Sequence, residues 1–129
     1  MRPLNILVLE DDDERILLFH KTFSTIPMCR GAHYSYTKTR DEFYRALNGE
    51  RFDVAFLDHD LGDNVDFNGT LATKAIIATP EFLRPRYIVI HSMNHIAAEE
   101  MHAKFNDVGI VSELVPFSEL IPKLQDMLK

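Results

Sequence analysis

Short apolar runs alternate with helix-like patterns along the whole chain, and this alternation most constrains the fold. Three runs are apolar on both faces of an extended strand: Ile6–Leu9, Val54–Leu57 and Tyr87–Ile90. Such strands are typical of the centre of a parallel sheet that is covered by helices on both sides. Two weaker runs, His33–Tyr36 and Gly109–Val111, predict strands nearer the edges of the same sheet.

Helix signals fill the gaps between these runs. Thr39 and Glu42 form a capping box. Potential N-cap residues begin three later helices: Asn68, Asn94 and Ser118. The chain thus reads as five strand–helix units, and right-handed crossovers between parallel strands leave few arrangements for them. The best fit is a three-layer, doubly wound (βα)5 fold of the α/β class and flavodoxin type, with sheet order 2-1-3-4-5.

Length and composition narrow the class of protein. The 129 residues fit a single domain, 1–129, which can hold its core without a metal or a disulfide. One cysteine, Cys29, rules out an internal disulfide, and the net charge of −6 argues against broad binding to nucleic acid. No apolar run approaches the ~20 residues of a membrane span. We therefore expect a cytoplasmic protein with no membrane segment and no DNA-binding domain.

Acidic, histidine and hydroxyl side chains follow the three central runs, at the edge where sheets of this order bind ligands. The residues concerned are Glu10, Asp11, Asp58, His59, Asp60, His91 and Ser92. The first two runs are neighbours in the predicted order, so their carboxylates are expected to converge. Crowded carboxylates repel one another unless a cation is present, and hard divalent ions prefer oxygen ligands. The sequence therefore predicts a divalent-metal pocket, most suited to Mg²⁺ and also open to Mn²⁺.

Several of these residues have plainer interpretations. Asp12–Glu14 can serve only the cap and the dipole of the following helix, and Asp60 can be a loop cap. His59 and His91 can act in acid–base chemistry or as ligands, or can simply pack. The sequence contains no glycine-rich phosphate loop and no Gly-x-Ser-x-Gly motif. We therefore reject flavin and nicotinamide cofactors, and a hydrolase with that serine motif is disfavoured.

Four segments stand out in order along the chain: Ile6–Asp12, Val54–Asp58, Asn68–Gly69 and Val115–Phe117. In these segments the chain resembles a response-regulator receiver domain. The resemblance implies that Glu10 and Asp11 are the acidic pair that positions Mg²⁺. It also implies that Asp58 is the phosphoacceptor.

The resemblance reaches two further positions and fails at one. It implies that Asp60 lends its backbone carbonyl to the metal. It also implies that Ser92, or less readily His91, occupies the hydroxyl position that senses a phosphoryl group. The receiver's lysine, which neutralises phosphoryl oxygens, is Val115 here. Basic side chains that could supply the missing charge are Arg84, Arg86 and Lys123.

A second resemblance is closer in detail. Leu57–Gly62 and Val89–Asn94 are similar to the signature of a receiver-like family proposed to process cyclic phosphates. That family carries extra histidines, which correspond to His59 and His91 here. The resemblance implies that a metal binds the phosphate oxygens and activates a water, and that a histidine protonates the leaving hydroxyl.

Three functions remain open at this point. The first is a metal-dependent phosphoesterase, whose partner is a phosphorylated small molecule or a nucleotide end. The second is a receiver phosphorylated on Asp58 in two-component phosphorelay signalling, whose partner is a histidine kinase or a phosphotransfer protein. The third is a degenerate receiver that only binds proteins and needs no metal. We expect a monomer or a weak dimer, with any self-association through His91–Lys129.

Overall fold

The computed structural model describes residues 3–61 and 67–128, so Gly62, the last residue of one sequence motif, lies outside the described residues. Within these ranges the strands form one parallel sheet in the order β2-β1-β3-β4-β5. The strands are β1 (Asn5–Leu9), β2 (His33–Thr37), β3 (Val54–Leu57), β4 (Ile88–Ile90) and β5 (Ser112–Leu114). This confirms the predicted fold and strand order.

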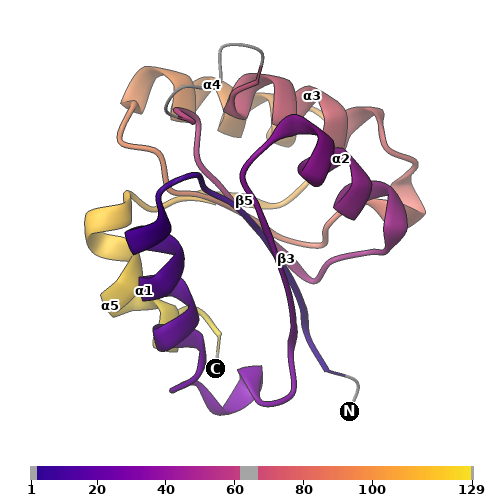
Figure 1. Ribbon diagram of the computed structural model, residues 1–129. Coiled ribbons are helices and arrows are strands. Elements are labelled where there is room, and N and C mark those ends of the chain that lie inside the picture. The colour runs from indigo at the N-terminus through magenta and orange to yellow at the C-terminus, as the bar shows by residue number, and fades with distance from the viewer. Residues whose placement is uncertain (1–2, 62–66, 129) are drawn as a thin grey trace.

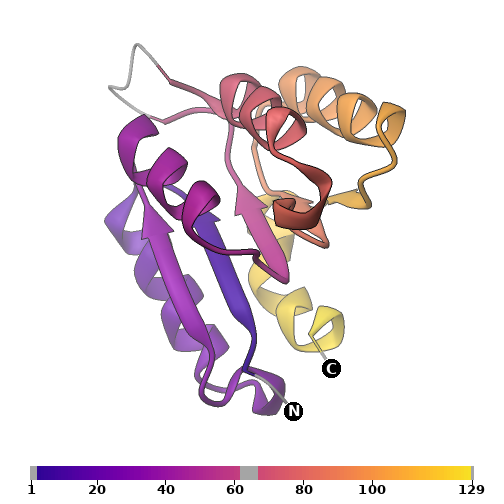
Figure 2. The ribbon, with the colours of Figure 1, turned by 90° about the vertical axis from the view of Figure 1, so that its right-hand side faces the viewer.

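The helices cover both faces of the sheet. Figure 1 shows α1 (Asp13–Phe23) and α5 (Phe117–Met127) on one side. The other side carries α2 (Arg40–Gly49), α3 (Gly69–Ala78) and α4 (His95–Asp107). Figure 2 views the molecule from the side of α2, α3 and α4, so that strands of the sheet are seen lying side by side. Two short 3-10 turns, η1 (Pro27–Cys29) and η2 (Glu81–Leu83), complete the described elements.

Alternation along the central strands divides the core into two halves. Ile6 and Val8 of β1 pack with the residues of α1 and α5, whereas Leu7 and Leu9 pack with those of α2, α3 and α4. Successive side chains of a strand point to opposite faces, so this division follows directly from the pleat. It also determines which helices meet the side chains that follow each strand.

The helix starts follow the predicted caps in three of four cases. Thr39 forms the full capping box, and the side chains of Asn68 and Asn94 each accept a hydrogen bond from a backbone N–H in the first turn. The prediction for Ser118 is wrong. The carbonyl of Pro116 accepts from the N–H groups of the third and fourth residues after it, so α5 already begins at Phe117.

The fifth strand lies three residues later than the predicted run Gly109–Val111. Gly109 has φ +77°, a left-handed conformation that ends α4. The N–H of Gly109 donates to Asn106, and the N–H of Ile110 donates to Phe105. These two bonds are the Schellman pattern of a helix C-terminus, so Gly109 and Ile110 belong to the end of α4.

No helix among the described residues combines the length and the apolar character that a bilayer crossing requires.

Candidate functional site

A hollow of about 230 Å³ lies where β1 and β3 end. It is lined by Glu10, Asp11, Asp12, Arg15, Asp58, Asp60 and Met93. The N–H of Asp58 donates to the Leu9 carbonyl at 3.2 Å, which continues the β1–β3 pairing by one residue and holds Asp58 beside Glu10. One carboxylate oxygen each from Glu10, Asp11 and Asp58 lies within 4.8 Å of the others. The predicted convergence of carboxylates is therefore present.

The crowding of these carboxylates changes their acidity. Burial, and then the nearby Asp58 carboxylate, raise the pKa of Glu10 to about 7. Burial is also the main cause that raises the pKa of Asp58 to about 6, against the lowering effects of the His59 N–H and of Arg15. Carboxylate oxygens are hard donors, and the hollow leaves room for water ligands. The donor set therefore fits a small divalent ion such as Mg²⁺.

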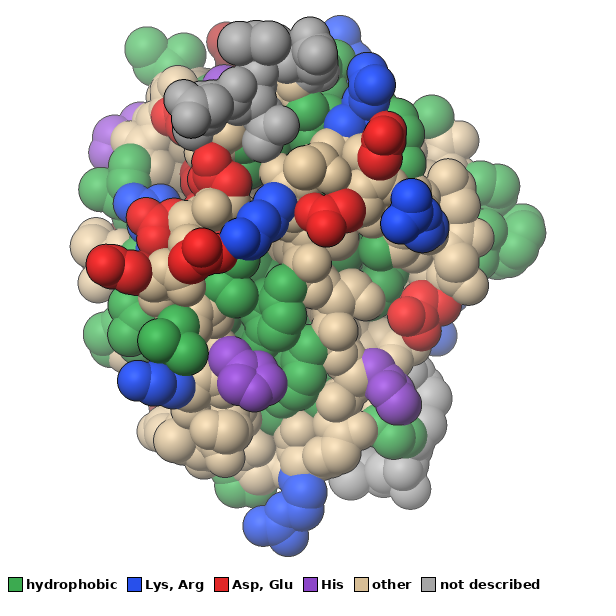
Figure 3. Space-filling model, in the orientation of Figure 1, with side chains coloured by type: hydrophobic (Ala, Val, Ile, Leu, Met, Phe, Trp, Pro, Cys, Tyr) green, Lys and Arg blue, Asp and Glu red, His purple; other side chains and the backbone are tan. Residues whose placement is uncertain are grey.

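One basic side chain reaches into this acidic cluster. Arg15 lies in the first turn of α1, and its Nη1 atom is 3.6 Å from Glu10 Oε1 and 3.8 Å from Asp58 Oδ2. Its guanidinium carbon lies 5.0 Å from the ring centroid of Phe117 on α5. The sequence prediction missed Arg15, although it follows the acidic run directly. Figure 3 shows acidic and basic side chains intermingled on this face of the molecule, near the start of α1.

The acids after Glu10 and Asp11 serve the helix as well as the hollow. The Oδ1 atom of Asp12 accepts from the N–H groups of Glu14 and Arg15, which makes Asp12 the N-cap of α1. Asp13 and Glu14 lie in the first turn, where they suit the helix dipole. The capping interpretation therefore describes all three, although Asp12 also lines the hollow.

His59 lies on the α3 side of the strand ends. Its Nδ1 atom is 2.8 Å from Asp60 Oδ1, and its Nε2 atom is 3.2 Å from the hydroxyl of Thr70 in α3. Asp60 itself lines the acidic hollow. The contact with Asp60 therefore places the imidazole at the rim of the hollow, between a carboxylate and a hydroxyl.

His91 lies on the opposite side, beneath the hollow and against α1 and α5. It is fully buried, with its ring 5.3 Å from Phe19 and 6.0 Å from Phe117, centroid to centroid. Its Nδ1 atom is 3.8 Å from Glu10 Oε1. Burial lowers the pKa of His91 to about 3, so the imidazole is neutral at pH 7. The two histidines are therefore separated by the acidic cluster.

Two local features shape the rim near the ends of β3 and β4. Ser92 is buried, and its Oγ atom accepts from the N–H of Asn94 at 3.0 Å, so the hydroxyl helps to form the turn before α4. Gly69, the first residue of α3, lies so close to the end of β3 that a Cβ atom there would come within 2.7 Å of the Asp58 carbonyl oxygen. Only glycine allows α3 to approach Asp58 and His59 in this way.

Val115, at the position where the resemblance puts the receiver's lysine, contributes no charge. Val115 is buried in the core half formed with α1 and α5. The substitutes considered from the sequence do not reach the hollow either. Arg84 donates to the carbonyls of Thr79 and Ile77, and Arg86 pairs with Asp53 at the other end of the sheet. Lys123 is exposed on α5. Among the residues that the structure describes, Arg15 is the basic side chain that lines the hollow.

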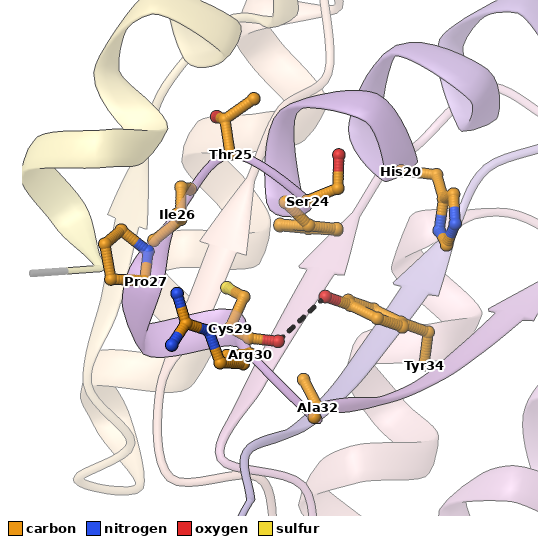
Figure 4. Close-up of a pocket in the computed structure, with 11 residues that line it drawn as sticks. His20, Ser24, Thr25, Ile26, Pro27, Cys29, Arg30, Ala32 and Tyr34 are labelled. Carbon is orange, nitrogen blue, oxygen red and sulfur yellow. Dashed lines mark hydrogen bonds between the residues drawn. The ribbon is translucent and has the colours of Figure 1, made fainter.

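A second hollow, of about 300 Å³, lies at the far end of α1, near the start of β2 (Figure 4). Its lining includes His20, Cys29, Arg30 and Tyr34 and contains no carboxylate. The Tyr34 hydroxyl donates to the Cys29 carbonyl at 3.4 Å, as the dashed line in Figure 4 shows. This hollow therefore lacks the oxygen donors that mark the hollow at the strand ends.

An acidic hollow at the carboxyl ends of β1 and β3, in a parallel sheet of this order, defines a receiver-like domain. The chain belongs to the family of cyclic-phosphate processing receiver domains, whose family model matches residues 6–107. This confirms the second sequence resemblance. No curated protein sequence matches the chain.

Solved structures support the fold assignment. The phosphorylated cyanobacterial phytochrome response regulator RcpA is 17% identical, with a TM-score of 0.70, over 98% of this chain and 91% of that chain. The receiver domain of a sensor histidine kinase from Pseudomonas aeruginosa PAO1, with magnesium coordinated in its active-site cleft, is 18% identical, with a TM-score of 0.72, over 98% and 95%. A receiver domain protein from Methanospirillum hungatei JF-1 is 19% identical, with a TM-score of 0.64, over 98% and 94%. At these identities the likeness establishes the fold.

Proposed function

We propose that the acidic hollow binds one divalent cation and that the domain hydrolyses a cyclic phosphate there. The observation that carries the proposal is the convergence of Glu10, Asp11 and Asp58, with carboxylate oxygens within 4.8 Å of one another. Burial is the main cause that raises the pKa values of Glu10 and Asp58, so keeping both carboxylates ionised costs free energy that a bound divalent cation would offset. The family description and the magnesium in the cleft of a similar receiver domain agree with this proposal.

Each residue of the site has a role in this proposal. Glu10, Asp11 and Asp58 would hold the cation through side-chain oxygens, and the Asp60 carbonyl would add a further oxygen. A divalent ion supplies charge neutralisation for the phosphate oxygens and a more acidic bound water. The Asp60 carboxylate would orient His59 through Nδ1, and Nε2, which lies 3.2 Å from the Thr70 hydroxyl, would exchange that contact for the leaving oxygen and protonate it.

His91 and Ser92 have supporting roles. His91 has no exposed surface, so we assign it no proton transfer. Its role in this proposal is to position the Glu10 carboxylate, which lies beside its ring. Ser92 shapes the turn before α4 and lies at the position where the receiver resemblance puts a hydroxyl that senses a phosphoryl group.

The test is turnover of defined substrates. The protein is incubated with Mn²⁺ or Mg²⁺ and with 2′,3′-cyclic and 3′,5′-cyclic nucleotides, and the products are followed by ³¹P NMR. We expect turnover that depends on the metal, is lost in Asp58→Asn and is reduced in His59→Ala. His33→Ala, which alters an exposed histidine at the start of β2, is the matched control. Absence of turnover, or equal rates for His59→Ala and the control, would overturn the proposal.

A second candidate function is signalling through phosphorylation of Asp58 by a histidine kinase or a phosphotransfer protein. The placement of Asp58 favours it, because this carboxylate lies directly after the central strand β3 and lines the hollow. Treatment with acetyl phosphate and Mg²⁺, followed by mass spectrometry, separates the two functions. A stable phosphoryl group that is absent from Asp58→Asn would favour signalling. A phosphoesterase is expected to accumulate none.

A further inference from the structure

We propose that Arg15 binds the phosphoryl oxygens of the ligand that enters the acidic hollow. This inference rests on the proposed function, and it identifies the positive charge that Val115 does not supply. Arg15 is the basic residue among those that line the hollow, and its Nη1 atom lies within 4 Å of both Glu10 and Asp58. A phosphoryl group held at these carboxylates through a cation would therefore lie within reach of the guanidinium.

The start of α1 fixes the position of Arg15. The side chain of Asp12 accepts from the Arg15 N–H at 3.2 Å, so the residue is tied to the N-cap in the first turn. Because α1 follows β1 after a short connection, this turn lies directly beside the strand end that carries Glu10. The N-cap thus places a long basic side chain at the mouth of the hollow.

The ring of Phe117 supports the guanidinium from α5. The Cζ atom of Arg15 lies 5.0 Å from the ring centroid, a distance at which a cation is attracted to the face of an aromatic ring. Phe117 in turn packs against Phe19, at 5.5 Å between centroids. The guanidinium therefore lies on an aromatic surface that is itself held in the core, which restricts its orientation.

The donors of Arg15 are not used up by the carboxylates. At 3.6 and 3.8 Å, its contacts with Glu10 and Asp58 are ion pairs that are too long for hydrogen bonds. A guanidinium has five N–H donors in a planar fork that matches the oxygens of a phosphate. Arg15 is thus attracted to the hollow by charge and retains hydrogen-bonding capacity for an anion. The ligand class that fits best is a phosphate ester or a cyclic phosphate bound together with the metal.

The test separates phosphate binding from metal binding. Isothermal titration measures the affinity for Mg²⁺ alone, and then for inorganic phosphate at saturating Mg²⁺, in the wild type, Arg15→Gln and Arg15→Lys. We expect Arg15→Gln to weaken phosphate binding about tenfold and Arg15→Lys to weaken it less, because lysine keeps the charge and loses the fork. The affinity for Mg²⁺ should be unchanged or higher, because a competing positive charge is removed.

Arg86→Gln is the matched control, since it removes the same charge at the other end of the sheet. Equal phosphate affinity in the wild type and Arg15→Gln would overturn the inference, as would a wild type that binds no phosphate. A purely structural role would lower the melting temperature of Arg15→Gln and leave its phosphate affinity intact, which also overturns it. If Arg15→Gln loses phosphate affinity while the wild type turns over no cyclic phosphate, the inference stands and the proposed function fails.

Discussion

The Nδ1 atom of His91 lies 3.8 Å from the Oε1 atom of Glu10, and among the described residues neither atom has a hydrogen-bond partner. Within the described ranges, the Nε2 atom of His91 is likewise buried without a hydrogen-bond partner. A buried polar atom without a hydrogen bond costs stability. These unpaired atoms of Glu10 and His91, beneath the acidic hollow, therefore lower the stability of the folded protein.

We expect His91→Leu to stabilise the metal-free protein. The substitution removes two unpaired nitrogen atoms and places an apolar side chain beside Phe19 and Phe117. The free energy of unfolding should rise by about 1 kcal/mol, measured by urea denaturation at pH 7.5 in EDTA. His33→Leu, at an exposed position, should change it little. A loss of stability in His91→Leu would show that the imidazole makes a favourable contact in the folded state.

The benefit of His91→Leu should grow as the pH falls. The pKa of His91 is lowered to about 3 in the folded protein, so below pH 6.5 the unfolded chain takes up a proton that the folded protein does not. As the pH falls, the free energy of unfolding of the wild type therefore decreases by up to about 1.4 kcal/mol per pH unit because of this residue, and that of the leucine variant does not. Urea titrations at pH 7.5, 6 and 5 should show a widening difference. A constant difference would contradict burial of a neutral imidazole.

Asp58→Asn should stabilise the metal-free protein with the opposite pH dependence. The pKa of Asp58 is raised to about 6, so the folded protein keeps a proton between pH 4 and 6 that the unfolded chain releases. The stability linked to this proton is present at pH 4 and is lost as the pH rises to about 6. The free energy of unfolding of Asp58→Asn should therefore rise above that of the wild type over this pH range. The difference should reach about 1 to 3 kcal/mol and stay constant at higher pH. Thermal unfolding in EDTA measures it, and a lower melting temperature at pH 7.5 would contradict it.

Mg²⁺ should stabilise the wild-type protein reversibly. A ligand at tenfold its dissociation constant adds about 1.4 kcal/mol to the free energy of unfolding, which raises the melting temperature by several degrees. The shift should disappear with EDTA and should be small in Asp11→Asn. Asp107→Asn removes an exposed acid at the end of α4 and should respond to Mg²⁺ like the wild type. An equal shift in all three proteins would indicate a non-specific salt effect.

Gly69→Ala should disturb the site through its backbone. The added Cβ would lie 2.7 Å from the Asp58 carbonyl oxygen and 2.7 Å from His59 Cα, so α3 must move away from the strand end. We expect the free energy of unfolding to fall by about 1 to 3 kcal/mol and the Mg²⁺-dependent rise in melting temperature to be smaller. Gly49→Ala is the control, because a Cβ at that position meets nothing within 4 Å. Unchanged stability and Mg²⁺ binding in Gly69→Ala would contradict the close approach.

Much of the fold was predictable because the central strands are buried on both faces. Runs such as Ile6–Leu9 leave a strong signal that does not depend on distant contacts. The prediction failed at the chain segments where backbone hydrogen bonds decide the outcome. Gly109 ends α4 through its left-handed conformation, and Pro116 starts α5 through its carbonyl, and neither signal is a matter of hydrophobic pattern.

The site was predictable where it depends on strand ends. Glu10 and Asp58 follow paired strands, so their proximity follows from the sheet order. Arg15 was missed because its role depends on Phe117, which is distant in sequence and becomes its neighbour only when α1 and α5 pack together. The separation of His59 and His91 was likewise invisible, because it depends on which helix each ring contacts.

The pairing of β1 with β3 brings Glu10 and Asp58 together from segments that are far apart in the chain. A cation held by both carboxylates would be a removable cross-link across the centre of the sheet. The amide hydrogens of these two strands exchange with solvent only when that centre opens, so their exchange should slow as Mg²⁺ is added. The supply of free Mg²⁺ would then set how often the middle of the domain opens.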